Sequence, residues 1–266
     1  MIEWARRAEA RGFSRLATLD RIVYPSYDSL VSLAAAAAVT ERIGLLTNIL
    51  LAPTRNPVLL AKEAASVDQL SGGRLTLGLG SGGREDDFTA VGKSFEDRGR
   101  RFDELLDVVH RAWRGEPVGS DAQRIGPLPP AGRVPVLIGG MAPAAVRRTV
   151  EWGGGWTAGG AGAELVEPMA KRVWSAWKEA GKPGEPLIVA LAYFALGDRD
   201  AESNRYIKDY YAYAPWADAL ADSVPRTVEG VRDAAKRFED AGVDELVFDP
   251  TVGEIEQVDL LADAVL

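Results

Sequence analysis

Cysteine is absent from this sequence of 266 residues, and histidine occurs once. Without cysteine the chain has no disulfide bonds, no thiolate metal ligands and no cysteine nucleophile. A Ser-His-Asp triad or a multi-histidine metal site would depend on His110 alone. Because His110 comes late in an amphipathic segment, 95–113, we interpret it as a packing or surface residue near the C-terminus of a helix. No metal site is expected.

Long apolar runs and an excess of basic residues are also absent. No apolar run reaches the ~18 residues that cross a bilayer, and the longest candidate, residues 30–39, is mostly alanine. The first residues, MIEWARRAEARGF, carry charges where a signal peptide needs an apolar core. A net charge of -8 gives no basic footprint for nucleic acid. We therefore expect a cytoplasmic protein with neither membrane nor nucleic-acid partners.

The sequence does contain an alternation of short apolar runs and longer amphipathic stretches. Hydrophobic residues make up 47% of the chain, enough for one large core. Strands that alternate with helices at this spacing predict parallel βαβ units. The expected strands are residues 14–18, 43–51, 75–79, 134–138, 155–158, 187–196 and 245–248. The expected helices are residues 2–11, 28–41, 57–70, 95–113, 143–152, 164–179 and 254–266, with a longer helical region at 201–240.

Length and element order predict one α/β domain over residues 1–266, a TIM (β/α)8-type barrel, which typically has about 250 residues. The chain opens on the helix 2–11, with no strand before it. The first strand of the barrel is therefore missing from this chain. Either the natural protein starts upstream or the barrel is incomplete. We favour an upstream start, because an unpaired strand edge exposes backbone donors and acceptors.

Polar residues interrupt the second expected strand, IGLLTNILLAP, at Thr47 and Asn48. Buried polar groups need hydrogen-bond partners, and a ligand with amide edges, such as an isoalloxazine ring, supplies them. Glycines recur in and after the next strand, where they leave room for a flat ring or for a close approach of backbone. They are Gly78, Gly80, Gly82 and Gly83.

Three segments, in this order, carry a resemblance to a known family: TERIGLLTNILLAP, NPVLLAKEAASVDQLSGGRLTLGLGSGG and FEDRGRRFDELLDVVHRAW. PVLIGG at 135–140 and GGGWTAGG at 153–160 continue the pattern. The chain resembles the luciferase-like monooxygenases and their deazaflavin-dependent relatives over nearly its whole length. The resemblance implies a barrel that holds a flavin or deazaflavin at the C-terminal ends of its strands.

For catalysis, the resemblance implies Asp20 and Arg21, which align with a pair beside the reactive face of the ring. Many relatives have histidine at the second position, as a proton donor or stabiliser. Arg21 stays protonated and cannot act as a general acid, but it can stabilise a developing anion. From the residues alone, an alternative is that Asp20 caps a helix or forms a rim ion pair.

For the cofactor, the resemblance implies three groups of residues. The first lies behind the ring, in a bulge where relatives often have a non-proline cis peptide: Thr47, Asn48 and Ile49. The second is a loop that contacts the ring or its ribityl chain: Gly80, Ser81, Gly82 and Asp86. The third is a phosphate-binding turn before a helix N-terminus, whose free amides favour an anion: Gly139, Gly140 and Met141. Glu85 and Asp87 are expected in a solvated acidic turn.

A cluster of aromatic residues follows the sixth expected strand. Spacings of four and seven place Tyr206, Tyr210 and Tyr213 on one helical face. The resemblance implies a substrate-covering segment here, so we expect these tyrosines in the substrate pocket. Packing against neighbouring helices is the alternative.

Two related reactions fit the resemblance. The first is monooxygenation of a small organic substrate with reduced FMN and O2, with a separate flavin reductase as a candidate partner. The second is hydride transfer that depends on coenzyme F420. Relatives commonly pair through helices near the second and third strands, so a homodimer is expected.

Two other classes of function stay open. The missing first strand and Arg21 leave a non-catalytic flavin-binding protein as an alternative. Residues 78–83 also match the dinucleotide spacing G-x-G-x-x-G. The polar segment 84–94 separates those glycines from the next helix, which disfavours a Rossmann unit.

Overall fold

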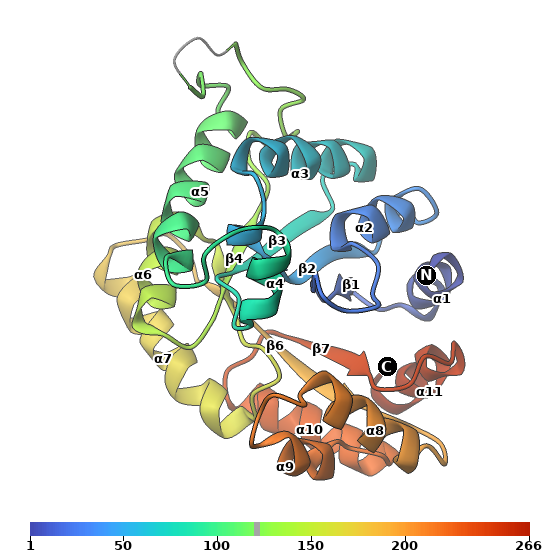
Figure 1. Ribbon diagram of the computed structural model, residues 1–266. Helices are drawn as coiled ribbons and strands as arrows, with labels where there is room; N and C mark the ends of the chain where they lie inside the picture. Colours follow the sequence, from blue (N-terminus) through green and yellow to red (C-terminus); the bar gives the residue numbers. More distant parts are fainter. Residues whose placement is uncertain (120–122) are drawn as a thin grey trace.

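Seven parallel strands, in the order in which they occur in the sequence, form one sheet that curves into a nearly closed barrel (Figure 1). The computed structural model describes residues 1–119 and 123–266. Its strands are β1 (Arg15–Thr18), β2 (Gly44–Leu51), β3 (Leu75–Gly80), β4 (Val136–Gly139), β5 (Gly155–Thr157), β6 (Leu187–Phe194) and β7 (Glu245–Pro250). All seven expected strands are present. Their sequential order is that of a TIM barrel with one strand fewer, and it contradicts the Rossmann alternative.

Helices follow the strands and surround the barrel (Figure 1). They are α1 (Ile2–Arg11), α2 (Ser29–Ala37), η1 (Ala52–Thr54), α3 (Pro57–Ser71), α4 (Glu85–Ala90), α5 (Arg98–Trp113), α6 (Pro143–Trp152), α7 (Ala163–Glu179), α8 (Asp200–Tyr210), α9 (Ala217–Ser223), α10 (Val228–Asp240) and α11 (Glu256–Val265). Two expectations are corrected. The polar segment 84–94 contains α4, and the long region 201–240 is divided into three helices. In the described parts of the chain, no helix has both the length and the apolar character needed to cross a membrane.

Local signals in the sequence explain where α3 begins and ends. The side chain of Asn56 accepts hydrogen bonds from the backbone N–H groups of Val58 and Leu59, and Pro57 occupies the first turn, where a missing N–H leaves no bond unmade. Gly72 ends the helix with φ of 70°, a left-handed conformation that glycine adopts without strain. These caps fix the path of the chain between β2 and β3.

The barrel interior is filled in layers by alternate residues of the strands. The middle layer is apolar and comprises Ala17, Leu46, Leu137, Val189 and Val247, with Leu187 beside them. At the N-terminal end of the strands, Arg15 donates a hydrogen bond to Thr76 and forms an ion pair with Glu245. The opposite end, where the strands terminate, carries the polar residues described below.

The barrel is open between β1 and β7. The ladder of paired strands runs from β1 to β7, and within the described residues no pairing joins these two edges. Arg15 of β1 and Glu245 of β7 face each other at an N–O distance of 2.8 Å. Outside the sheet α1 packs beside α11, so that the two chain ends lie near each other (Figure 1). An ion pair between Arg7 and Asp259, at 3.0 Å, joins the two helices.

Candidate functional site

The C-terminal ends of β2, β3 and β4 meet around an irregularity in β2. The register between β2 and β3 shifts between Thr47 and Leu50. Inside this bulge the peptide bond between Asn48 and Ile49 is cis, as the family resemblance implies. The bulge therefore turns the side chains of β2 out of the regular alternation at the mouth of the barrel.

Asn48 and Thr47 differ in how their polar groups are satisfied. The hydroxyl of Thr47 donates to the carbonyl of Gly78 at 2.9 Å. The Oδ1 atom of Asn48 accepts a hydrogen bond from the hydroxyl of Thr157 at 2.6 Å. The Nδ2 atom of Asn48 is buried and finds no hydrogen-bond partner among the described residues. The mouth thus contains one amide donor without an acceptor, which a ligand can supply.

The glycines of β3 and β4 make room for Ile49. A Cβ atom on Gly80 would lie 1.9 Å from Cδ1 of Ile49, and one on Gly139 would lie 2.9 Å from its Cγ2. At Gly78 the obstacle is backbone, the carbonyl oxygen of Thr47, at 2.1 Å. At Gly78 and Gly80 the glycines therefore serve a close approach within the protein rather than an open space for a ring.

The expected cofactor loop and phosphate-binding turn lie at the ends of β3 and β4. Ser81 is half-buried, and Gly82, with φ of 77°, packs against the ring of Phe88. The carbonyl of Gly140 accepts a hydrogen bond from the indole of Trp156, whereas Met141 is 44% exposed. No side chain caps the N-terminus of α6. Pro143 has no N–H, and the N–H of Ala145 donates to the carbonyl of Ala142 at 2.8 Å, so the phosphate-binding turn stays a prediction.

Asp20 is buried and fully engaged with the protein. Its carboxylate accepts hydrogen bonds from the backbone N–H of Leu51 and from the guanidinium of Arg55, each at 2.9 Å. Burial raises the pKa of Asp20, while the charge of Arg55 opposes that shift. These contacts fasten the loop after β1 to the end of β2. A catalytic role for Asp20 stays a prediction.

Arg21 is held by α4. Its Nε donates to Asp87 at 2.7 Å and its Nη2 to Asp86 at 3.2 Å. Asp87 also accepts hydrogen bonds from the backbone N–H groups of Ile22 and Val23. The side chain of Asp87 is 1% exposed, so the expectation of a solvated turn is wrong for this residue. It is buried because α4 packs its first turn under the loop that follows β1.

The expected substrate-pocket tyrosines lie together, although they do not share one helix. Tyr206 and Tyr210 stack with ring centroids 6.0 Å apart. Tyr213 lies beyond the end of α8 and is 59% exposed, so its placement on the same helical face is corrected. Arg84 joins the group, because its guanidinium carbon lies 4.3 Å from the ring centre of Tyr210 and 4.4 Å from that of Tyr213.

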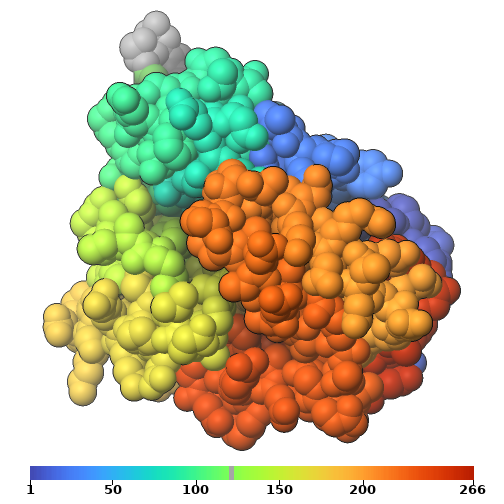
Figure 2. Space-filling model, turned by 60° about the horizontal axis from the view of Figure 1, so that its bottom comes forward, coloured from blue at the N-terminus to red at the C-terminus, as the bar shows by residue number. Residues whose placement is uncertain are grey.

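The contact of Arg84 with the tyrosines links the loop after β3 to the segment between β6 and β7. Figure 2 shows this segment, α8 and α9 in orange, spread over the front face of the molecule and adjoining the teal region that contains α4. Arginine over aromatic rings gains about 0.5–1 kcal/mol per contact at exposed sites. The cover over the barrel mouth is therefore attached by modest interactions.

Sequence reasoning missed three polar residues at the mouth: Thr157, Tyr193 and Asp249. The hydroxyls of Tyr193 and Tyr211 lie 2.7 Å apart, and burial raises the pKa of both. Asp249 directly follows the expected strand 245–248. Its place at the C-terminal end of a strand is the signal that would have identified it.

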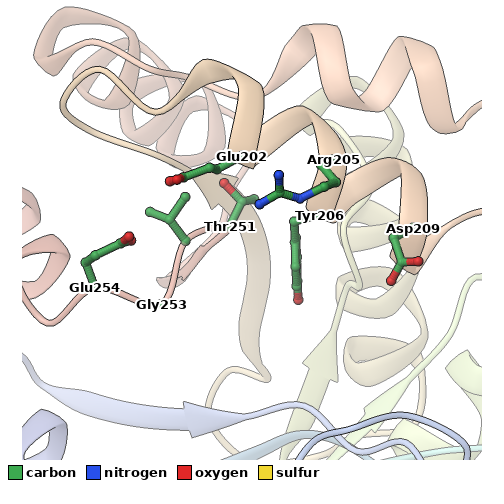
Figure 3. Close-up of a pocket in the computed structure, with 8 residues that line it drawn as sticks. Glu202, Arg205, Tyr206, Asp209, Thr251, Gly253 and Glu254 are labelled. Carbon is green, nitrogen blue, oxygen red and sulfur yellow. The ribbon is translucent and has the colours of Figure 1, made fainter.

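A cleft of about 440 Å³ opens beside the tyrosines, between α8 and the loop after β7 (Figure 3). Tyr206 forms one wall, and the guanidinium of Arg205 lies over Thr251 (Figure 3). Most of its charged side chains are acidic: Glu202, Asp209 and Glu254. The cleft gives a small molecule access to the side of the tyrosine cluster.

His110 and the metal prediction can be assessed from the same structure. His110 is packed between Trp113 and Trp152, and its Nδ1 lies 2.8 Å from the carbonyl oxygen of Leu106. Burial lowers its pKa. The packing interpretation is therefore confirmed.

Across residues 1–119 and 123–266, no three carboxylate or histidine side chains gather in a way that could hold a metal ion.

Comparison with known proteins gives matches over nearly the whole chain. A sequence profile of the family described as luciferase-like monooxygenase matches residues 1–264. The uncharacterized protein Rv0940c of Mycobacterium tuberculosis is 30% identical over 226 residues, which cover 73% of this chain and 78% of that protein.

Two solved structures illustrate the range of similar folds. One is an F420-dependent secondary alcohol dehydrogenase in complex with an F420-acetone adduct (TM-score 0.81, 18% identity, 99% of this chain and 93% of that one covered). The other is the oxygenating constituent of 3,6-diketocamphane monooxygenase from Pseudomonas putida in complex with FMN (TM-score 0.78, 16% identity, 98% and 89% covered). At these identities the likeness shows a shared fold.

Proposed function

Because the chain belongs to the luciferase-like monooxygenase family, we propose that it is an oxidoreductase that holds the ring of reduced FMN or of coenzyme F420 at the barrel mouth and uses it on a small organic substrate. The observation that carries this proposal is the buried Nδ2 of Asn48, which has no acceptor among the described residues. A buried donor left unpaired costs about 1–3 kcal/mol. The carbonyl and ring-nitrogen acceptors of an isoalloxazine-type ring fit that donor.

Each part of the proposed site has a separate task. Ile49, seated in the glycines of β3 and β4, supports one face of the ring. The N-terminus of α6, which no side chain caps, is the proposed position of a phosphate. Arg21, fixed by Asp86 and Asp87, places a permanent positive charge near the tyrosines. That charge stabilises an anion that develops on the bound reactants.

Monooxygenation with reduced FMN and O2 is the first candidate reaction. The family description and the FMN complex of the Pseudomonas putida protein support it. Reduced flavin, when bound, supplies the electrons for oxygen activation. The contribution of this chain is to exclude water, for which the stacked rings of Tyr206 and Tyr210 are suited.

Hydride transfer with coenzyme F420 is the second candidate. The fold shared with an F420-dependent alcohol dehydrogenase supports it. A specific observation in this chain also favours it: Asp249 at the mouth has its pKa raised by burial to about 7. A carboxyl group that holds a proton near neutral pH suits a reaction in which hydride and proton move separately.

We also propose that the protein forms a homodimer. Adjacent helices α2 and α3 expose the large apolar side chains of Val31 and Leu59, which are 67% and 57% accessible, and Tyr27 before α2 is 77% accessible. Apolar side chains gathered on one face of a soluble protein mark an interaction surface. A second copy of the chain is the proposed partner.

Cofactor titration tests the proposal. The purified protein is titrated separately with FMN, reduced FMN and F420, and binding is followed by fluorescence. We expect submicromolar binding of one cofactor and about tenfold or greater weakening in Asn48→Ala, because one hydrogen bond to the ring is lost. Asn204→Ala on α8 is the matched control, because the amide oxygen of Asn204 accepts a hydrogen bond from Arg226. Failure of all three ligands to bind would contradict the proposal.

The same titration separates the two reactions. Binding of F420 without binding of either FMN form excludes the monooxygenase. Binding of reduced FMN, followed by oxygen consumption that depends on an organic substrate, excludes hydride transfer from F420 as the main reaction.

A further inference from the structure

Asp249 lies inside the barrel mouth, yet it is not needed for any of the cofactor contacts above. It is paired in register with Tyr193 of β6. Val247, two residues earlier, packs in the apolar interior layer, and alternate residues of a strand face the same side. The side chain of Asp249 therefore points into the barrel, at the end where barrel enzymes place their reacting groups.

The carboxyl group of Asp249 has no partner that would explain it as a structural residue. Its Oδ2 atom is buried and accepts no hydrogen bond from the described residues. Burial raises its pKa to about 7, and no charged side chain of the described residues contributes to that shift. Asp20 provides the contrast, because its carboxylate is buried and bonded to Leu51 and Arg55. Both oxygens of Asp20 are held by the protein, whereas the Oδ2 atom of Asp249 is left free to react.

Tyrosines from four parts of the fold lie within the influence of the charge of Asp249. The charge of Asp249 adds to burial in raising the pKa of Tyr24, Tyr193, Tyr206, Tyr210 and Tyr211. They come from the loop after β1, from β6, from α8 and from the turn after it. Their hydroxyls stay neutral at physiological pH, so the surroundings of Asp249 are aromatic, and Asp249 is the group among them that titrates near neutrality. The guanidinium carbons of Arg21 and Arg84 lie 5.8 Å and 4.3 Å from the ring centres of Tyr24 and Tyr210.

We propose that Asp249 exchanges a proton with the oxygen atom of a carbonyl or alcohol substrate bound beside it and these tyrosines, an inference that rests on the proposed function. In the direction of reduction, the carbonyl carbon receives a hydride from a reduced deazaflavin or flavin. The carbonyl oxygen receives the proton of Asp249, and the product is an alcohol. The carboxylate that remains regains a proton from water. In the direction of oxidation each transfer is reversed, so that Asp249 accepts the hydroxyl proton.

The substrate class follows from the side chains around Asp249. The rings of Tyr206 and Tyr210 offer flat apolar surfaces, while the paired hydroxyls of Tyr193 and Tyr211 offer one polar edge. A small, mainly apolar molecule with a single oxygen function suits these surfaces. A strongly anionic substrate does not, because ionised Asp249 would repel it.

Two readouts test this inference. Without cofactor, the side-chain carboxyl carbons of isotope-labelled aspartates are followed by NMR from pH 4 to pH 9. We expect one aspartate that titrates near neutrality in the wild type and is missing in Asp249→Asn, with Asp233→Asn, an exposed residue of α10, as the control. With the cofactor that binds, carbonyl reduction is measured against pH. Asp249→Asn should lower the rate about 10²- to 10⁴-fold and remove the fall in rate above about pH 7.

The outcomes separate this inference from the proposed function. If neither FMN nor F420 binds, both fail together. If Asp249→Asn binds the cofactor with wild-type affinity and keeps the wild-type rate and pH profile, only the role of Asp249 is overturned. Asp249→Glu, which keeps a carboxyl group, should regain part of the rate and the pH dependence. Loss of rate in Asp249→Glu equal to that in Asp249→Asn would indicate a packing role and overturn the inference.

Discussion

Two adjacent carboxylates, Asp86 and Asp87, contact the same arginine but lie in different surroundings. The side chain of Asp86 is 51% exposed, whereas that of Asp87 is 1% exposed. Asp87 satisfies two backbone N–H groups in addition to Arg21, so its removal leaves three donors, with the buried Nε of Arg21 among them, without their acceptor. The same residue type therefore contributes very differently at neighbouring positions.

A comparison of the two alanine variants measures this difference. Asp87→Ala should lower the free energy of unfolding by about 3–5 kcal/mol, because it leaves Arg21 as a buried charge without its main partner. Asp86→Ala should lower it by at most about 1 kcal/mol, as for other solvent-screened ion pairs. Urea unfolding followed by tryptophan fluorescence gives both values. Equal losses in the two variants would contradict the buried placement of Asp87.

Asp249 makes stability depend on pH. Its pKa is about 7 in the folded protein, against a usual value of 3.8. Between these pH values the folded state holds a proton that the unfolded state has lost. The stabilising contribution of protonated Asp249 is therefore complete below about pH 4 and is lost as the pH rises to about 7. The shift corresponds to at most about 4 kcal/mol. Asp249→Asn should therefore be more stable than the wild type at pH 8 but not at pH 4.

Thermal unfolding at the two pH values checks this prediction. Taking the difference between variant and wild type cancels the titration of other groups, including Asp20, Glu63 and Asp68, whose pKa values are also raised by burial. A difference between the two proteins that does not change with pH would show that Asp249 is ionised in the folded state at pH 4 and above.

At the scale of elements, the side chain of one residue in β2 packs against glycines in β3 and β4. Ile49, turned inward by the bulge of β2, occupies the space left by Gly80 of β3 and Gly139 of β4. Backbone pairing between these strands does not by itself require glycine at positions 80 and 139. The absence of Cβ atoms permits Ile49 to lie across them, so the bulge and the glycines form one unit at the barrel mouth.

Substitution of Gly80 tests that unit. Gly80→Ala should destabilise the protein by about 1–3 kcal/mol, because the new Cβ overlaps Cδ1 of Ile49. Ile49→Val removes that atom, so the double variant should be more stable than the sum of the two single changes predicts. Gly83→Ala is the control, since nothing lies within 4 Å of its Cβ position. Strict additivity of Gly80→Ala and Ile49→Val in chemical unfolding would refute the contact.

At the scale of the whole molecule, two regions stand out: the gap in the barrel and an exposed apolar face. The barrel is open between β1 and β7, where the ion pair of Arg15 with Glu245 faces the gap. On another side, α2 and α3 expose Val31 and Leu59. An apolar pair on adjacent helices favours association with a second copy, because burying each such side chain contributes on the order of 1–2 kcal/mol.

Charge placed on this face should separate the proposed dimer. The double variant Val31→Glu, Leu59→Glu should sediment as a monomer at concentrations where the wild type is a dimer, because two carboxylates per copy would be buried unpaired. Leu165→Glu on α7, at a residue that is 56% exposed, should leave the dimer intact. A wild-type protein that is monomeric at high micromolar concentration would contradict the proposed interface.

The sequence by itself determined the strands, most of the helices, the family and the glycine-rich mouth. These depend on local patterns: period-two and period-3.6 hydrophobicity, the Asn56–Pro57 and Gly72 caps, and motifs in fixed order. It also indicated Thr47 and Asn48, because polar residues inside an apolar strand are conspicuous without any structure. The short helix α4 was not predicted, because its acidic residues are equally typical of an exposed turn.

Only the tertiary structure decided which polar groups are satisfied. Asp20 and Asp87 are bonded by partners 31 to 66 residues away in the chain, and Asp249 is left free among tyrosines from other elements. The structure likewise shows that the space beside Gly80 and Gly139 is filled by Ile49, which comes from a different strand. Hydrogen bonding and steric fit are properties of pairs of residues brought together by folding, so no single position in the sequence contains them.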